Sequence, residues 1–143
     1  MQPFKLSEAL KSGPVVLFFY PKAFTSGCTL EAHLFAEATP RFAALNTKVL
    51  GVSHDDLETL KRFSLEECRS QFAVAADTKA STIKAYDVGF LLKPDMADRV
   101  TYLIGQDRKV IFVYGSLDPK DHVEMTLKAL TKSREPNRPE QAQ

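Results

Sequence analysis

The amino-acid sequence predicts an α/β domain in which a central mixed β-sheet carries helices on both faces. Short apolar runs rich in β-branched and aromatic residues alternate with segments whose apolar residues recur every three or four positions. The last two apolar runs are separated by a short polar stretch, residues 105–109, as in a β-hairpin. The 143 residues suffice for one such domain, which we expect to span residues 1–132.

The first half of the chain alternates predicted strands and helices. Residues 15–19 (VVLFF) form a buried strand that ends at Pro21, because proline cannot donate to a β-ladder. Apolar spacing predicts a helix over residues 28–45, with a kink or an interruption at Pro40. Residues 48–53 (KVLGVS) predict the second strand. This half is therefore a strand–helix–strand unit with parallel strands.

The second half adds a helix, a third strand, a short helix, a hairpin and a closing helix. Asp55 or Asp56 is expected to cap the first of these helices, whose apolar face continues to Cys68. The later elements are expected over residues 72–76, 81–86, 100–104 and 110–114 and after Asp118-Pro119. Parallel units followed by an antiparallel hairpin indicate a thioredoxin-like fold. Residues 133–143 are polar and are expected to form a disordered tail.

Charge and apolar patterning exclude several classes of protein. Lys and Arg number 19 and Asp and Glu 18, a net charge of +1, so the chain lacks the basic excess of a nucleic-acid binder. No apolar run approaches the roughly 20 residues that cross a bilayer. The first fourteen residues carry no apolar signal-peptide core, which predicts a cytoplasmic protein.

The two cysteines, Cys28 and Cys68, are too few for a disulfide framework and too far apart for a CxxC pair. The three histidines show no metal-ligand spacing, so we expect no metal. Cys28 lies in the first turn of the helix after the first strand, where free N–H groups and the helix dipole stabilise a thiolate. From these residues alone, a small buried side chain explains Cys28 as well as a reactive thiol does.

The segment around Cys28 resembles the active-site signature of the peroxiredoxins. Pro21, Thr25 and Cys28 have the signature's spacing, and VVLFFYPKAFTSGCTLEA resembles its bacterioferritin-comigratory (Q-type) branch. The resemblance continues in VLGVSHDD and in RVTYLI, and covers about residues 15–130. It implies a thioredoxin-like fold and a thiol peroxidase that reduces hydrogen peroxide and organic hydroperoxides without a cofactor.

The resemblance also implies roles for single residues. Cys28 would attack the O–O bond and become a sulfenic acid. Arg99 matches the family arginine, which would stabilise the thiolate and bind the peroxide. Thr25 would orient the peroxide, Pro21 would limit access of water, and the N–H groups of Gly27 and Cys28 would stabilise the departing oxygen.

Each of these residues also has a purely structural explanation. Glu31, one turn after Cys28, would orient Arg99 or would be an ordinary solvated glutamate. Arg99 could be a solvated arginine at a strand start, Thr25 a helix N-cap, and Pro21 a strand terminator.

The chain departs from the family pattern in three places. His33 stands where many Q-type members have a resolving cysteine, and we assign it no catalytic role. Cys68 lies about one turn beyond the other resolving position, near Ser64, so it is either the resolving cysteine or a buried structural thiol. The family's opening β-hairpin is not recognisable before Val15.

The resulting hypothesis is a peroxidase that takes electrons from thioredoxin, glutaredoxin or a small thiol and acts as a monomer or weak dimer. An intramolecular disulfide between Cys28 and Cys68 would close the first half of the cycle. The alternatives are a one-cysteine peroxidase that uses an external thiol and a thioredoxin-fold sensor that reacts once without turnover.

Overall fold

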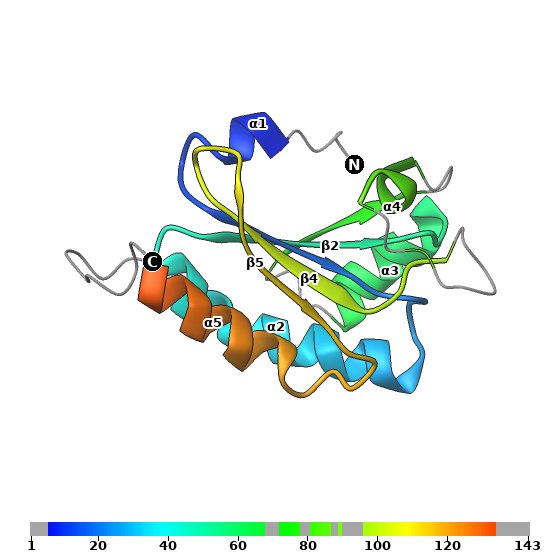
Figure 1. Ribbon diagram of the computed structural model, residues 1–143. Coiled ribbons are helices and arrows are strands. Elements are labelled where there is room, and N and C mark those ends of the chain that lie inside the picture. The colour runs from blue at the N-terminus through cyan, green and yellow to red at the C-terminus, as the bar shows by residue number, and fades with distance from the viewer. Residues whose placement is uncertain (1–5, 68–71, 78–80, 87–88, 90–95, 134–143) are drawn as a thin grey trace.

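The computed structural model describes residues 6–67, 72–77, 81–86, 89 and 96–133 (Figure 1). Helices and strands alternate along most of this length, as the sequence predicts. In chain order the elements are α1 (Leu6–Ala9), β1 (Val15–Phe19), α2 (Ser26–Ala43), β2 (Lys48–Ser53), α3 (Leu57–Glu66), β3 (Ala73–Ala76), α4 (Ser81–Ala85), β4 (Val100–Ile104), β5 (Val110–Gly115) and α5 (His122–Ser133).

The described strands form one mixed sheet in the order β3-β2-β1-β4-β5. Strands β1, β2 and β3 are parallel, whereas β4 is antiparallel to both β1 and β5. Leu17 at the centre of β1 pairs with Leu50 on one side and Tyr102 on the other. The predicted parallel units and antiparallel hairpin are thereby confirmed, with β1 in the middle of the sheet.

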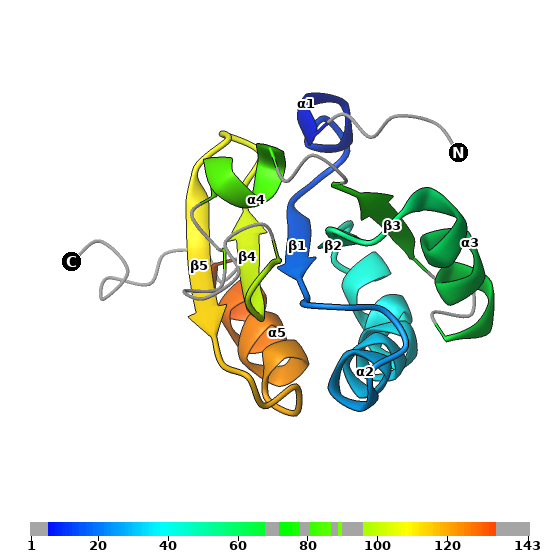
Figure 2. The same ribbon diagram turned by 90° about the vertical axis from the view of Figure 1, so that its right-hand side faces the viewer.

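Helices cover both faces of this sheet (Figure 2). Because side chains alternate along a strand, β1 supplies both cores. Val16 and Phe18 point to the face where α2, α3 and α5 pack, and Val15, Leu17 and Phe19 point to the face of α1 and α4. The predicted α/β architecture with helices on both faces is confirmed.

Helix α2 departs from the sequence-based expectation at Pro40. The helix continues through Pro40 and ends at Ala43, so the expected interruption is wrong. Pro40 forfeits one backbone hydrogen bond. Phe35 and Phe42, on either side of it, are both fully buried in the same core, and this packing holds the helix together.

The other helix boundaries differ from the predictions except at α3, whose N-cap, Asp56, is one of the two expected residues. Helix α1 was not predicted, because four residues are too few to show periodicity. Helix α3 is capped by Asp56, whose side chain accepts a hydrogen bond from the Thr59 N–H at 2.8 Å. Helix α5 begins at His122, later than the predicted start at Asp118-Pro119.

No helix in the described part of the chain is long and apolar enough to cross a membrane. Ser133, the first residue of the predicted tail, is the last residue of α5, so the tail prediction is wrong at that position. Cys68 and residues 134–143 lie outside the described residues.

Candidate active site

The site lies where β1 ends and α2 begins. The backbone ladder continues one residue past β1, since the Tyr20 N–H donates to the Val52 carbonyl at 3.1 Å. The loop that follows is held by Asp55, which accepts hydrogen bonds from the Ala23 N–H at 2.7 Å and the Ser53 hydroxyl at 2.8 Å. Sequence reasoning considered Asp55 only as a helix cap; the structure shows that it anchors this loop to the end of β2.

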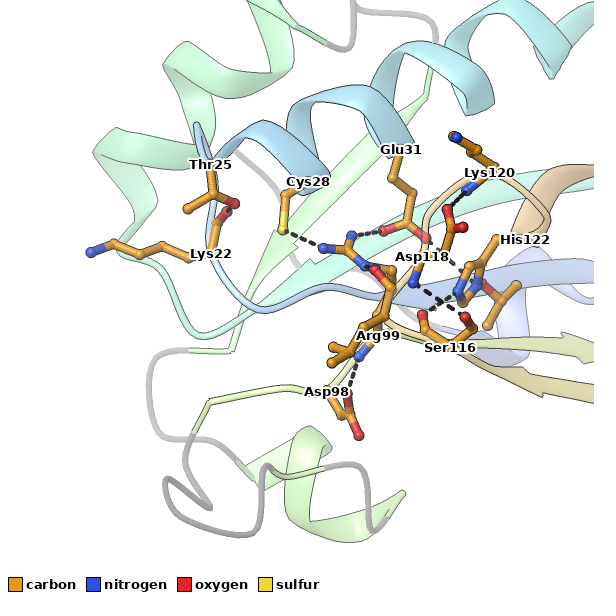
Figure 3. Close-up of polar contacts among 12 residues, drawn as sticks. Lys22, Thr25, Cys28, Glu31, Asp98, Arg99, Ser116, Asp118, Lys120 and His122 are labelled. Atoms are coloured by element: carbon orange, nitrogen blue, oxygen red, sulfur yellow. Dashed lines mark hydrogen bonds and ion pairs between the residues drawn. The ribbon is translucent and has the colours of Figure 1, made fainter.

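Cys28 is the third residue of α2 and is 1% exposed. In the first turn of a helix the backbone N–H groups have no partner within the helix, so they favour a negative charge there. Thr25 occupies the N-cap position, but its side chain caps nothing: its hydroxyl donates to the Lys22 carbonyl at 2.7 Å. Lys22, Thr25 and Cys28 therefore lie together at the start of the helix (Figure 3).

Arg99 directly precedes β4 and reaches across to Cys28 (Figure 3). Its Nη2 donates to the Cys28 sulfur at 3.5 Å and its Nε to the Leu117 carbonyl at 2.9 Å. The side chain is only 6% exposed, so the alternative of a solvated arginine is wrong. Burial opposes the guanidinium charge, but Glu31 and Cys28 raise the pKa of Arg99.

Gly27 leaves the space that the guanidinium needs. A β-carbon at this position would lie 2.9 Å from Nη2 of Arg99, closer than such contacts are found. The sequence suggested that this glycine lets a ligand approach the backbone, and the structure shows that it also admits Arg99.

Glu31 holds the other side of Arg99. Its Oε1 accepts from Nη1 of Arg99 at 2.7 Å, and the carboxyl group is fully buried, so the alternative of a solvated glutamate is wrong. Burial raises the pKa of Glu31 to about 7, although the charge and hydrogen bond of Arg99 act in the opposite direction. The carboxyl group thus titrates near neutral pH inside the site.

His122 is a site residue that sequence reasoning missed. It begins α5, is fully buried, and places Nδ1 at 3.6 Å from Oε2 of Glu31. Thr126 and Leu130, one and two turns later, are also buried, so the face of α5 they share could have indicated a buried histidine. Nothing in the sequence indicates that this face meets Glu31.

Pro21, His33 and Cys68 are the other residues that the sequence singled out. Pro21 is half-buried and lies two residues after the end of β1. His33 is half-buried and forms a 2.9 Å contact with Glu67 at the end of α3, as expected for a histidine with a structural partner. Cys68, the resolving candidate, follows Glu67 outside the described residues. Within the described ranges, no group of three His, Cys, Asp or Glu side chains could hold a metal ion.

Known proteins share this chain's sequence and fold. The family model described as "AhpC/TSA family" matches residues 1–113. The peroxiredoxin Bcp of Bacillus subtilis is 34% identical over 132 residues, which cover 88% of this chain and 82% of the relative.

Solved structures agree with this relation. The peroxidoxin BcpB of Mycobacterium tuberculosis superposes with a TM-score of 0.86 at 34% identity, covering 94% of this chain and 88% of the other. The bacterioferritin comigratory protein of Xanthomonas campestris, described by its alkyl peroxide reduction activity, gives a TM-score of 0.77 at 26% identity, covering 87% and 80%. A buried thiol at a helix start, paired with an arginine, thus lies on the scaffold of these enzymes. The chain belongs to the AhpC/TSA family, in its Bcp/Q peroxiredoxin branch, and is a thiol-dependent peroxidase.

Proposed function

We propose that Cys28 is the peroxidatic cysteine and that Arg99, Thr25, Pro21, Gly27 and Glu31 form its site. The observation that carries the proposal is the 3.5 Å contact between Nη2 of Arg99 and the sulfur of Cys28 at the start of α2. A helix N-terminus and a fixed cation both favour the thiolate, which is the form that attacks peroxides. Among the described residues, Cys28 is the only thiol.

The first step is an in-line displacement. The Cys28 thiolate attacks the outer oxygen of the peroxide, the S–O bond forms as the O–O bond breaks, and the leaving oxygen takes a proton to become water or an alcohol. Arg99 already donates to Glu31, Leu117 and the sulfur. Its charge stabilises the negative charge that builds on the two peroxide oxygens.

Smaller contributions come from the loop before α2. The Thr25 hydroxyl donates its hydrogen to the Lys22 carbonyl. The lone pairs of the hydroxyl oxygen therefore stay available to accept a hydrogen bond from the peroxide. The N–H groups of Gly27 and Cys28 in the first turn are donors for the departing oxygen. Pro21 offers no N–H and shields the thiolate, and Glu31 orients Arg99 through Oε1.

The second step would be resolution by Cys68. The Cys68 thiol displaces water from the Cys28 sulfenic acid and forms an intramolecular disulfide, which a dithiol such as thioredoxin or glutaredoxin, or a small thiol, then reduces. A disulfide needs Cα atoms within about 7 Å, so we expect the first turn of α2 and the end of α3 to open locally. The contact between His33 and Glu67, 2.9 Å long, joins these two helices next to Cys68 and would break on opening.

Two alternative mechanisms are compatible with the same fold and site. A one-cysteine peroxidase would leave the sulfenic acid to an external thiol, and a sensor would react once and stall. Peroxides are the substrates and a thiol is the reductant in this family. For this chain we further propose hydrogen peroxide and alkyl hydroperoxides as substrates, a cytoplasmic location, and a monomer or weak dimer that binds neither nucleic acid nor membranes.

Mass spectrometry under non-reducing conditions, after one equivalent of peroxide, tests the proposal. A protein lighter by two hydrogens, with a peptide that joins Cys28 to Cys68, is the expected product. A stable sulfenic or sulfinic acid on Cys28 with Cys68 free would establish the one-cysteine mechanism. Oxidation of Cys68 alone, with Cys28 untouched, would refute the assignment of Cys28.

A further inference from the structure

His122 is fixed in a single orientation beneath the site. Its Nε2 lies 2.8 Å from the Ser116 carbonyl, which can only accept, so Nε2 carries a hydrogen. Its Nδ1 lies 2.7 Å from the Thr101 hydroxyl. The ring of Tyr114 packs edge-on against the imidazole, with ring centroids 4.8 Å apart. The imidazole is thus held at both ring nitrogens and packed against one aromatic ring.

The atom that lacks a hydrogen-bond partner in this arrangement belongs to Glu31. Its Oε2 is buried and has no hydrogen-bond partner among the described residues, and Nδ1 of His122 lies 3.6 Å from it (Figure 3). A buried carboxylate oxygen without a donor is costly. One proton placed on Oε2 or on Nδ1 removes that cost, because it either neutralises the carboxylate or gives it a cationic partner.

The charges of the cluster also favour a proton on Glu31 or His122. Arg99 is one cation between two groups that become anions, Glu31 on Nη1 and Cys28 on Nη2. If both are ionised, the buried cluster carries an excess negative charge. If the Glu31–His122 pair holds a proton, the negative charge of Glu31 is neutralised. The positive charge of Arg99 then stabilises the Cys28 thiolate.

We propose that Glu31 and His122 form a buried proton-holding pair that stabilises the Cys28 thiolate by keeping Glu31 from competing for Arg99. His122 is then a positioning residue that acts on the sulfur through Glu31 and Arg99 without touching it. This inference rests on Cys28 being the reactive thiol of the proposed function.

The titration of the two groups supports this arrangement. Burial raises the pKa of Glu31 to about 7. Burial lowers the pKa of His122, an effect that the hydrogen bond to Ser116 opposes; Arg99 lowers it too, and Asp118 and Asp121 in the turn before α5 raise it. The proton therefore lies mainly on Glu31, whose Oε2 lies 3.6 Å from Nδ1 of His122.

Two substitutions separate this charge effect from simple support of Arg99. Glu31→Gln keeps an oxygen that can accept from Nη1 of Arg99, but it removes the competing charge. His122→Asn keeps a polar group near the position of Nδ1, but it removes the titratable proton. The probe is iodoacetamide, whose reaction with the Cys28 peptide is followed by mass spectrometry across pH and reports the thiolate fraction.

The proposal predicts effects of opposite sign. As the pH rises through about 7, where Glu31 ionises in the wild-type protein, alkylation of Cys28 becomes up to about tenfold faster in E31Q than in the wild type, because one buried charge near the sulfur is worth on the order of one pH unit. Alkylation becomes several-fold slower in H122N. In the double variant it matches E31Q, because without the Glu31 charge His122 has nothing to neutralise. Glu37→Gln, which removes an exposed charge from the same helix outside the cluster, is the matched control and leaves the profile unchanged.

The proposal is overturned if E31Q slows alkylation, or if H122N slows it equally with and without the Glu31 charge. Either result would mean that the cluster only supports Arg99 mechanically.

A measurement on the intact protein covers the case in which H122N does not fold. The side-chain carboxyl ¹³C signal of Glu31 and the imidazole ¹⁵N signals of His122 should titrate together, at a higher pH in the wild-type protein than in C28S, where no thiolate forms. If the signals of Glu31 and His122 titrate at the same pH in the wild-type protein and in C28S, the coupling to Cys28 is refuted. Failure of the proposed function is a separate result, since it would appear as full peroxidase turnover in C28S.

Discussion

Single side chains decide the chemistry of this site. Cys28 by itself is a small buried thiol in a hydrophobic core, in contact with a cluster that includes Ala32 and Phe35. What sets it apart from a structural cysteine is the guanidinium of Arg99 at 3.5 Å, held by the Glu31 carboxylate at 2.7 Å. A buried cation with fixed donors stabilises a thiolate and a polarised peroxide at once.

Cys28→Ser should abolish peroxidase turnover. A serine hydroxyl stays protonated at neutral pH and cannot form a sulfenic acid, so the attacking atom is lost. Peroxide consumption with thioredoxin as reductant measures this. Cys68→Ser is the comparison: it should leave the first oxidation of Cys28 intact while removing the disulfide. Residual turnover in C28S at the wild-type rate would show that another group attacks.

Arg99→Met should slow the reaction of Cys28 with peroxide at least tenfold. Methionine keeps much of the apolar bulk but removes the charge and the three hydrogen bonds to Cys28, Glu31 and Leu117. Tenfold corresponds to about 1.4 kcal/mol in the barrier. Stopped-flow measurement of the second-order rate constant tests it, and Arg41→Met, at an exposed site near the end of α2, is the control. A rate within twofold of wild type would exclude a catalytic role for Arg99.

At the scale of elements, three segments meet in the cluster around Cys28. Helix α2 supplies Cys28 and Glu31, the start of β4 supplies Arg99, and the start of α5 supplies His122. β1 and β4 are neighbouring strands, and α2 and α5 pack on the same face of the sheet, so all three come together at one end of it (Figure 2). The mixed sheet order therefore builds the cluster.

Gly27→Ala should weaken the site without unfolding the helix. An alanine β-carbon would lie 2.9 Å from Nη2 of Arg99, which must move away from the sulfur. Alanine is also the better helix former, so the free energy of unfolding should change little. We expect about tenfold slower oxidation of Cys28 at a similar midpoint in urea. Ser26→Ala, one residue earlier and exposed, is the control; a wild-type rate in G27A would mean that Arg99 has room to adjust.

At the scale of the whole molecule, the buried cluster links stability to pH. The pKa of Glu31 in the folded protein, about 7, lies above its ordinary value of 4.5. Between these values the folded state binds more protons than the unfolded state. The contribution of Glu31 to stability is therefore greatest below pH 4.5 and declines as the pH rises to about 7.

Glu31→Gln should remove this dependence. Urea denaturation at several pH values is expected to show the wild-type protein losing free energy of unfolding relative to E31Q between about pH 4.5 and pH 7. The difference between the two proteins cancels the contributions of surface carboxylates, which the substitution leaves unchanged. A constant difference across this range, or one that favours the wild type as pH rises, would show that Glu31 is ionised throughout.

The sequence alone determined the elements and the candidate thiol. Strands β1 and β2 appear at their predicted residues, because short continuous runs of mainly apolar residues are local signals. Cys28 is placed at the start of a helix by the same local periodicity. The resemblance carried by Pro21, Thr25 and Cys28 then supplied Arg99, which no local pattern distinguishes from a surface arginine.

Only the tertiary structure decided how these residues work together. Arg99 is 71 positions from Cys28 and 68 from Glu31, so their contacts arise from sheet topology. Burial turns Glu31 and Arg99 from ordinary charged residues into a strongly coupled pair, and it places His122 against the second oxygen of Glu31. The helix continuing through Pro40 is a tertiary outcome as well, since core packing outweighs one lost backbone hydrogen bond. Periodicity records which side of an element faces inward, whereas the identity of the partner depends on which elements the fold brings together.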